Sequence, residues 1–144
     1  MSGLDGTYRL EGCQLLRQDG VVEEPYGSDP EGLLVYSPSG FFSGHVMRKG
    51  LPRFRRGARL ADPAQTKAAF LGYIGYFGRF SVDEAAKTVT HSVLGSWHPN
   101  WVGTAQVRHF RSSGNRLLLE TPILGSGGKS RRIRLMWRRV GGAP

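Results

Sequence analysis

Short stretches in which hydrophobic and polar residues alternate fill most of the chain, and glycine-containing turns separate them. Alternation with a period of two is typical of strands with one buried face, and regular turn signals between such strands indicate an antiparallel all-β protein. The first part of the chain predicts a strand in GTYRLEGCQLLRQDG, followed by a hairpin of residues 32–40 and 41–49. The Gln-Asp-Gly and Ser-Pro-Ser-Gly segments supply the turns.

The rest of the chain continues the pattern after one interruption. That interruption is the only predicted helix, near residues 62–72 and after the third strand, because Asp62 suits the N-cap and Pro63 the first helical position. GYFGRFSVD and KTVTHSVLGSW then predict one hairpin, and VGTAQVRHFR and RLLLETPIL predict another. RRIRLMWRRV predicts the last strand. We therefore expect eight or nine strands, paired in sequence order.

The length of the chain and the number of strands limit the architecture. A chain of 144 residues corresponds to a single domain, residues 1–144. Exposed strand edges invite aggregation, and closure into a barrel removes them. A barrel of about eight strands has an interior that either packs solid or holds one small ligand. The alternation alone fits a sandwich as well as a barrel.

A set of motifs adds information that the alternation does not hold. The motifs are GTYRL, Pro25 and Gly27, DPEGLLVYSPSGFFSGHVMR, LPRF, GYIGYFGRFSVDE, TVTHSV, PNWVGTAQVRHF and LMWRR. Through them the chain resembles the bacterial lipocalin-like domain family, small barrels of the calycin type, over roughly residues 4–139. The resemblance implies an antiparallel up-and-down lipocalin-like barrel with a ligand-sized cavity. It implies no single function, because similar barrels serve as carriers and as enzymes.

One position departs from the family pattern. The family usually has Trp where this chain has Tyr8. In lipocalin-type barrels that Trp packs across the barrel floor under a late Arg, for which Arg138 or Arg139 is the match here. The resemblance thus implies that Tyr8 serves as the aromatic plate of the floor.

The alternation also assigns side chains to the two faces of a strand. His91 shares a face with Val89 and Val93, which favours an inward position. The Gln-x-Arg-x-aromatic pattern that the family suggests as lumenal places Gln106 and Arg108 inside as well. A buried guanidinium without a partner is very unfavourable, and few acids lie nearby in the pattern. Arg108 therefore meets a ligand's carbonyl, enolate or carboxylate oxygen, or else it binds backbone carbonyls or lies at the barrel mouth.

These side chains form the candidate site. His91 and Arg108 are the predicted catalytic residues, His91 as a general acid or base and Arg108 as the group that polarises a carbonyl. The predicted substrate-binding residues are Tyr36, His45, Tyr76, Trp101, Gln106 and Trp137. Each of these can equally be an ordinary core or rim residue. The four histidines lack a metal-ligand spacing, so we expect no metal and no cofactor.

Charge is concentrated in two segments. Twenty basic and eleven acidic residues give a net charge of +9, and residues 48–59 and 129–139 hold much of it without any acid. Such segments are solvated, or they bind an acidic partner, for which we expect an acyl carrier protein. We expect no nucleic-acid partner, because no nucleic-acid-binding motif accompanies them. No apolar run approaches the roughly 18–20 residues that span a bilayer, and the first residues lack a signal pattern, so we expect no membrane partner and a cytoplasmic protein.

The sequence leaves two functions open. The first, which we favour narrowly, is a cofactor-independent enzyme of the cyclase or isomerase type. It would act in the lumen on a hydrophobic, carbonyl-bearing small molecule, a secondary-metabolite intermediate, by holding it in a reactive conformation. The second is a non-catalytic small-molecule binding or carrier protein with the same lumen. The protein is expected to be a monomer or a homodimer.

Overall fold

The computed structural model describes residues 3–141, which form nine strands and one α-helix. The strands are β1 Gly6–Arg17, β2 Val22–Glu23, β3 Glu31–Tyr36, β4 Phe41–Met47, β5 Tyr73–Asp83, β6 Thr88–Ser96, β7 Ala105–Ser113, β8 Arg116–Glu120 and β9 Arg131–Val140. The helix is α1, Pro63–Leu71. Single turns of 3-10 helix lie at Ala58–Leu60, Pro99–Trp101 and Gly127–Lys129. The mostly-strand composition confirms the all-β prediction.

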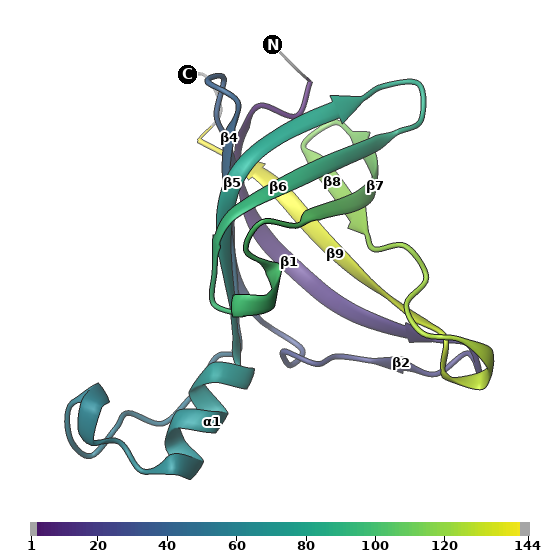
Figure 1. Ribbon diagram of the computed structural model, residues 1–144. Helices are drawn as coiled ribbons and strands as arrows, with labels where there is room; N and C mark the ends of the chain where they lie inside the picture. The colour runs from purple at the N-terminus through teal and green to yellow at the C-terminus, as the bar shows by residue number, and fades with distance from the viewer. Residues whose placement is uncertain (1–2, 142–144) are drawn as a thin grey trace.

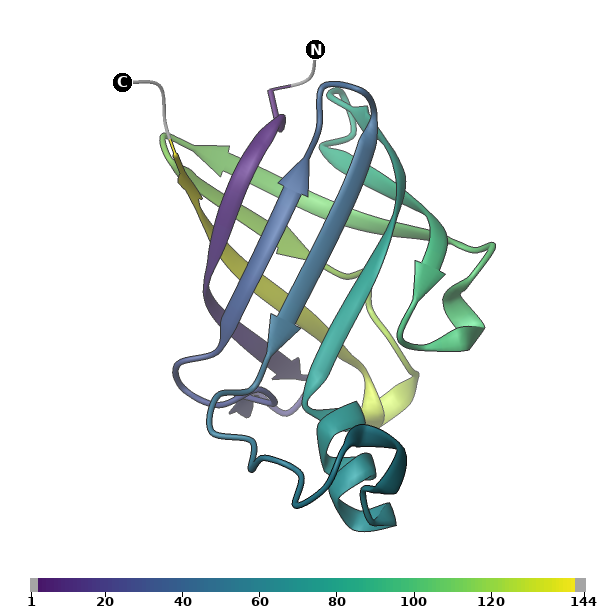
Figure 2. The same cartoon turned by 90° about the vertical axis from the view of Figure 1, so that its left-hand side faces the viewer.

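The strands close into an antiparallel barrel (Figure 1, Figure 2). From β3 to β9 each strand pairs with the next, β3 also pairs with β1, and β9 returns to β1 with Tyr8 opposite Arg139. Closure leaves eight barrel strands, and β2 is a short extra strand at the edge of β1. The up-and-down barrel is thereby confirmed over the sandwich. The two-residue β2 was not predicted, and because of it α1 follows the fourth strand instead of the third.

The barrel is closed at the end where β1 begins and β9 ends. There the Tyr8 hydroxyl donates to the Leu4 carbonyl at 2.8 Å, and Arg139 Nη2 donates to the Tyr8 oxygen at 2.7 Å. The Arg139 guanidinium carbon lies 4.9 Å from the centre of the Tyr8 ring. Arg138 instead pairs with Glu11 on the outer side at 3.0 Å. The floor therefore uses Tyr8 in the place of Trp and Arg139 as the late arginine.

A long connection between β4 and β5 extends away from the opposite end of the barrel (Figure 1). We call residues 48–72 the basic arm. Within it, Asp62 caps α1 by accepting from the Gln65 amide at 2.8 Å, as the sequence predicts. None of the α1 side chains is buried. Among residues 3–141 no helix has the length and apolar character to cross a membrane.

Candidate functional site

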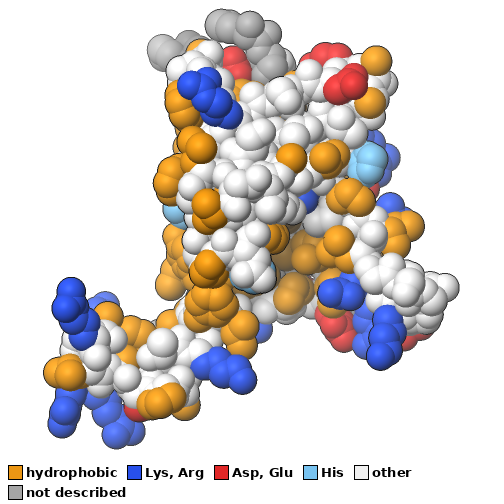
Figure 3. All heavy atoms as spheres, viewed as in Figure 1, with side chains coloured by type: hydrophobic (Ala, Val, Ile, Leu, Met, Phe, Trp, Pro, Cys, Tyr) orange, Lys and Arg blue, Asp and Glu red, His pale blue; other side chains and the backbone are white. Residues whose placement is uncertain are grey.

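The barrel holds a cavity of about 240 Å³ that opens away from the Tyr8 floor. Its apolar wall comprises Leu34, Val46, Ile74, Leu119, Leu124, Ile133 and Leu135. The space-filling view shows a hollow in the front of the barrel with hydrophobic side chains inside it (Figure 3). An apolar cavity of about 150 Å³ binds benzene, so this one has room for a substituted ring or a small fused pair.

Gln106 and Arg108 line the cavity from a part of β7 that is paired on one side. The β7–β8 ladder begins at His109, so that the β7 residues before it pair with β6 alone. Beyond Glu120 the chain leaves β7 and returns to β9 through residues 121–130. Arg108 is the last β7 residue before the ladder with β8 starts. The β7–β8 ladder is thus interrupted next to Arg108, which lines the cavity and carries a full positive charge.

His91 lies deep in the barrel and is neutral. Its side chain is 1% exposed, and its ring stacks on Phe42 with centroids 4.2 Å apart. Nε2 lies 2.6 Å from the Tyr36 hydroxyl and Nδ1 lies 2.9 Å from the Tyr76 hydroxyl. Burial, and to a smaller extent the nearby charge of Arg108, lower the pKa of His91 to about 3. Both ring nitrogens are occupied, and an imidazole with that pKa is a poor general base near neutral pH.

Arg108 carries a buried charge without an acid beside it. The residue is 6% exposed, Nη1 donates to the Val107 carbonyl at 3.0 Å, and the guanidinium carbon lies 5.7 Å from the centre of the Trp101 ring. Within residues 3–141 no carboxylate forms an ion pair with it; Glu120, on the neighbouring strand, pairs with Arg134 at 2.9 Å. Burial of an uncompensated charge is unfavourable. The Val107 carbonyl and the Tyr76 hydroxyl are neutral hydrogen-bond partners of the guanidinium, and neither compensates its charge.

The other polar groups of the cavity come from four segments. Burial raises the pKa of Tyr76, and the charge of Arg108 opposes part of that rise. Trp101, in the turn before β7, packs edge-on against Tyr76 with ring centroids 5.1 Å apart. Gln106 Nε2 donates to Thr104 Oγ1 at 2.8 Å. Trp137 Nε1 is buried and has no hydrogen-bond partner among the described residues. Tyr76, Trp101, Gln106 and Trp137 all line the cavity, as do His91 and Arg108.

Two predicted binding residues are placed differently. Tyr36 is 1% exposed and lies behind His91, outside the set of residues that line the cavity. His45 borders the cavity between Gly44 and Val46, but its ring nitrogens contact Ser43 at 3.0 Å and Tyr73 at 2.6 Å. Ser43 and Tyr73 alternate with the inward residues of their strands. The His45 ring therefore turns toward the outer face, and it offers a ligand no free nitrogen.

One polar wall residue was missed by the sequence reasoning. Thr121 is buried, lines the cavity, and accepts from the Ile133 amide at 2.9 Å. It continues the inward series of Leu117 and Leu119 by steps of two, just past the end of β8. The period of the strand could have identified it.

Comparison with known proteins agrees with this architecture. The chain is similar to the 4'-hydroxy-3'-methoxypropiophenone carrier protein ppsC of Aspergillus oryzae, with 36% identity over 107 residues that cover 68% of this chain and 96% of that protein. No solved structure matches the chain significantly. The lipocalin-like domain matches residues 5–140, nearly the whole chain. The protein belongs to the lipocalin-like domain family.

Proposed function

We propose that the protein binds a small aromatic molecule with an acceptor oxygen in its barrel and carries it without changing it. The observation that carries this proposal is the buried Arg108 guanidinium, which faces an apolar cavity and lacks a carboxylate partner within the described chain. A ligand carbonyl or carboxylate would compensate that charge. The similar Aspergillus oryzae protein is named as the carrier of an aromatic ketone, which fits both the size and the polarity of this cavity.

The carrier reading is better supported than the cyclase or isomerase that we favoured from the sequence. The similar Aspergillus oryzae protein is named a carrier protein. In this chain, both ring nitrogens of His91 are hydrogen-bonded to tyrosine hydroxyls. An acid–base catalyst needs a proton-transfer atom within reach of the substrate and a pKa near the working pH. We therefore assign His91 the role of holding the Tyr76 hydroxyl, and not that of an acid–base catalyst. Turnover of a secondary-metabolite intermediate remains a prediction without support from these contacts.

We expect saturable binding of 2-acetylnaphthalene and 2-naphthoate, one molecule per chain, with micromolar dissociation constants. Quenching of tryptophan fluorescence would report it, because Trp101 and Trp137 line the cavity. Mass spectrometry after long incubation should recover both molecules unchanged. Absence of saturable binding for both would overturn the proposal, and a product of altered mass would restore the enzyme reading.

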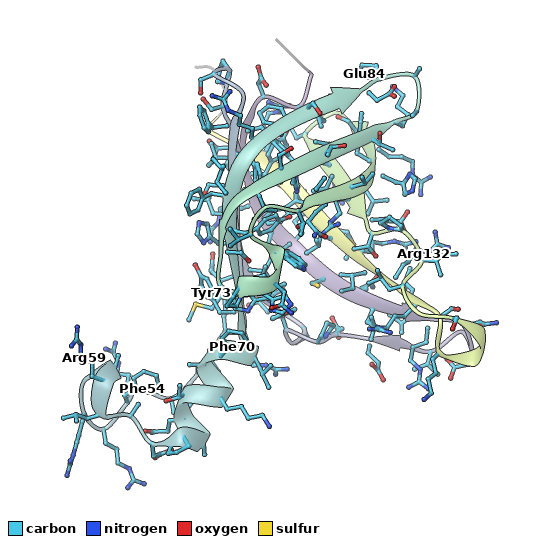
Figure 4. All side chains as sticks on the ribbon, viewed as in Figure 1. Phe54, Arg59, Phe70, Tyr73, Glu84 and Arg132 are labelled. Atoms are coloured by element: carbon cyan, nitrogen blue, oxygen red, sulfur yellow. The ribbon has the colours of Figure 1, made fainter. Side chains whose placement is uncertain are left out.

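The basic arm provides a surface on which a protein partner could dock. Its tip exposes four arginines that no acid of the described chain pairs with, namely Arg53, Arg55, Arg56 and Arg59. Phe54 and Arg59 lie at the far end of the arm and Phe70 lies at its junction with the barrel (Figure 4). Phe70 contacts Trp97, which in turn contacts the cavity residue Trp101. The arm thus connects a cationic surface to the cavity end of the barrel, and we propose an acidic acyl carrier protein as its partner.

Reversing the charge of the arm should weaken this docking. For the triple variant R53E, R55E and R56E we expect at least a tenfold loss of affinity for an acidic acyl carrier protein at low salt. The loss should shrink as added salt screens the charges. Fluorescence anisotropy of a labelled carrier protein would measure it, with the exposed Arg111→Glu on β7 as the control. Equal affinities of the triple variant and the unchanged protein would refute the docking proposal.

A further inference from the structure

The contacts of His91 determine more than its charge. We infer that His91 orients the Tyr76 hydroxyl so that its proton points into the cavity, and that the site thereby selects ligands whose oxygen accepts a hydrogen bond. The inference rests on the proposed binding function and names the ligand chemistry that it requires. His91 and Tyr36 are positioning residues in this arrangement, and Tyr76 is the residue that touches the ligand.

The first step is that the two tyrosines cannot play the same role. A neutral imidazole carries one N–H donor and one acceptor nitrogen. His91 is neutral because it is enclosed, stacked on Phe42 and close to the Arg108 charge. Since each ring nitrogen meets a tyrosine hydroxyl, one tyrosine donates to His91 and the other accepts from it.

The second step assigns the donor. Tyr36 is 1% exposed, and within residues 3–141 its hydroxyl makes its hydrogen bond to His91 Nε2. If Nε2 carried the proton, the Tyr36 proton would be buried without an acceptor, which costs about 1–3 kcal/mol. Tyr36 therefore donates to Nε2. The remaining imidazole proton lies on Nδ1, and it is donated to the Tyr76 oxygen at 2.9 Å.

The third step concerns the Tyr76 proton. Tyr76 lines the cavity, and its hydroxyl oxygen receives the proton of His91 Nδ1 and a hydrogen bond from the positive Arg108. The oxygen lone pairs are thus turned toward these groups, and the O–H is left for the ligand. Trp137 Nε1 is a further unpartnered donor in the same cavity. The site therefore presents donors from β5, β7 and β9, and it fits an aryl ketone or aryl carboxylate.

The tautomer can be observed without any ligand. In protein labelled with ¹⁵N-histidine, the chemical shifts of the two His91 nitrogens distinguish the protonated nitrogen from the acceptor. We expect a proton on Nδ1 and none on Nε2. In Tyr36→Phe, where Nε2 has no partner in either tautomer, we expect this preference to be lost and part of the protein to carry the proton on Nε2. A proton on Nε2 in the unchanged protein would overturn the inference.

The consequence for ligands is tested with an isosteric pair. 2-Acetylnaphthalene has a carbonyl where 2-isopropenylnaphthalene has a C=CH₂ group, so the two differ mainly in the acceptor. We expect the ketone to bind about tenfold more tightly. We expect Tyr76→Phe to reduce that preference to the part that Arg108 and Trp137 supply, while changing the affinity for the alkene less than twofold. Tyr36→Phe, which changes no cavity-lining residue, should weaken the ketone selectively. It should also return the bound carbonyl stretch in the infrared spectrum to a higher frequency.

The possible failures separate the two proposals. Equal affinity for ketone and alkene in the unchanged protein would overturn this inference and leave the binding function standing. Failure of both molecules and of 2-naphthoate to bind would overturn the proposed function and the ligand preference with it. If Tyr36→Phe lowered both affinities equally, Tyr36 would have a structural role only, and the proposed orientation of Tyr76 would be refuted.

Discussion

Replacing Arg108 with methionine is expected to raise the stability of the empty protein and to weaken the binding of 2-naphthoate about a hundredfold. The side chain is buried, and within the described chain its partners are a backbone carbonyl, the Tyr76 hydroxyl and an indole ring, but no carboxylate. An apolar side chain of similar length removes the unfavourable burial of charge, and we expect a gain in unfolding free energy of about 1 kcal/mol. The lost charge-assisted hydrogen bond to a carboxylate accounts for about 2–3 kcal/mol of binding.

Opposite signs in the two measurements distinguish a ligand-binding arginine from a structural one. Thermal unfolding and the 2-naphthoate titration should be compared for Arg108→Met and for Arg111→Met, an exposed residue on the same strand. Arg111→Met should leave both quantities nearly unchanged. If Arg108→Met lowered the melting temperature and kept the affinity, the bond to Val107 would be its main role. Arg108→Lys should keep some affinity, because it retains the charge without the planar pair of donors.

The local pattern of the sequence predicts which side chains face the lumen. Alternation placed His91 beside Val89 and Val93, and all three are buried. For Arg108 and Phe110 the alternation gave no clear face, and the Gln-x-Arg-x-aromatic pattern of the family placed them inward, where they are buried. The same period argues against His45, because Gly44 and Val46 on either side of it are buried. A strand position is a local property, so a local pattern is enough to assign it.

Contacts between side chains of different strands cannot be predicted from the alternation within one strand. His91 lies on β6 and is bound by tyrosines from β3 and β5, which are 55 and 15 residues away in the chain. Closure between β1 and β9 likewise joins the two ends of the chain, and the resemblance to a family, not the alternation, predicted it. These distances depend on strand tilt and register around the whole barrel. The sequence could therefore name the polar side chains of the cavity but not show which of them satisfy one another.

The pairing of His91 with two tyrosines has a second measurable consequence, the pH dependence of stability. Burial lowers the pKa of His91 to about 3 in the folded protein, whereas an unfolded chain has the ordinary value of about 6.5. Between these values the unfolded chain binds the extra proton and the folded protein does not. The stability that the neutral, buried His91 contributes is thus complete above pH about 6.5. It is lost as the pH falls toward 3, by about 1.4 kcal/mol per pH unit and on the order of 5 kcal/mol in total.

Urea unfolding at several pH values from 7 to 4 should show this contribution as the difference between the unchanged protein and His91→Gln. Glutamine can donate to one tyrosine and accept from the other but has no proton to gain, so its stability should fall less steeply with acid. The comparison cancels the titration of the carboxylates, such as Glu31 with its pKa lowered by Arg9, because both proteins contain them. His109→Gln, at an exposed position, should follow the unchanged protein. Parallel curves for the unchanged protein and His91→Gln would mean that folded His91 accepts a proton as readily as unfolded His91. The neutral imidazole on which the orientation of Tyr76 depends would then be wrong.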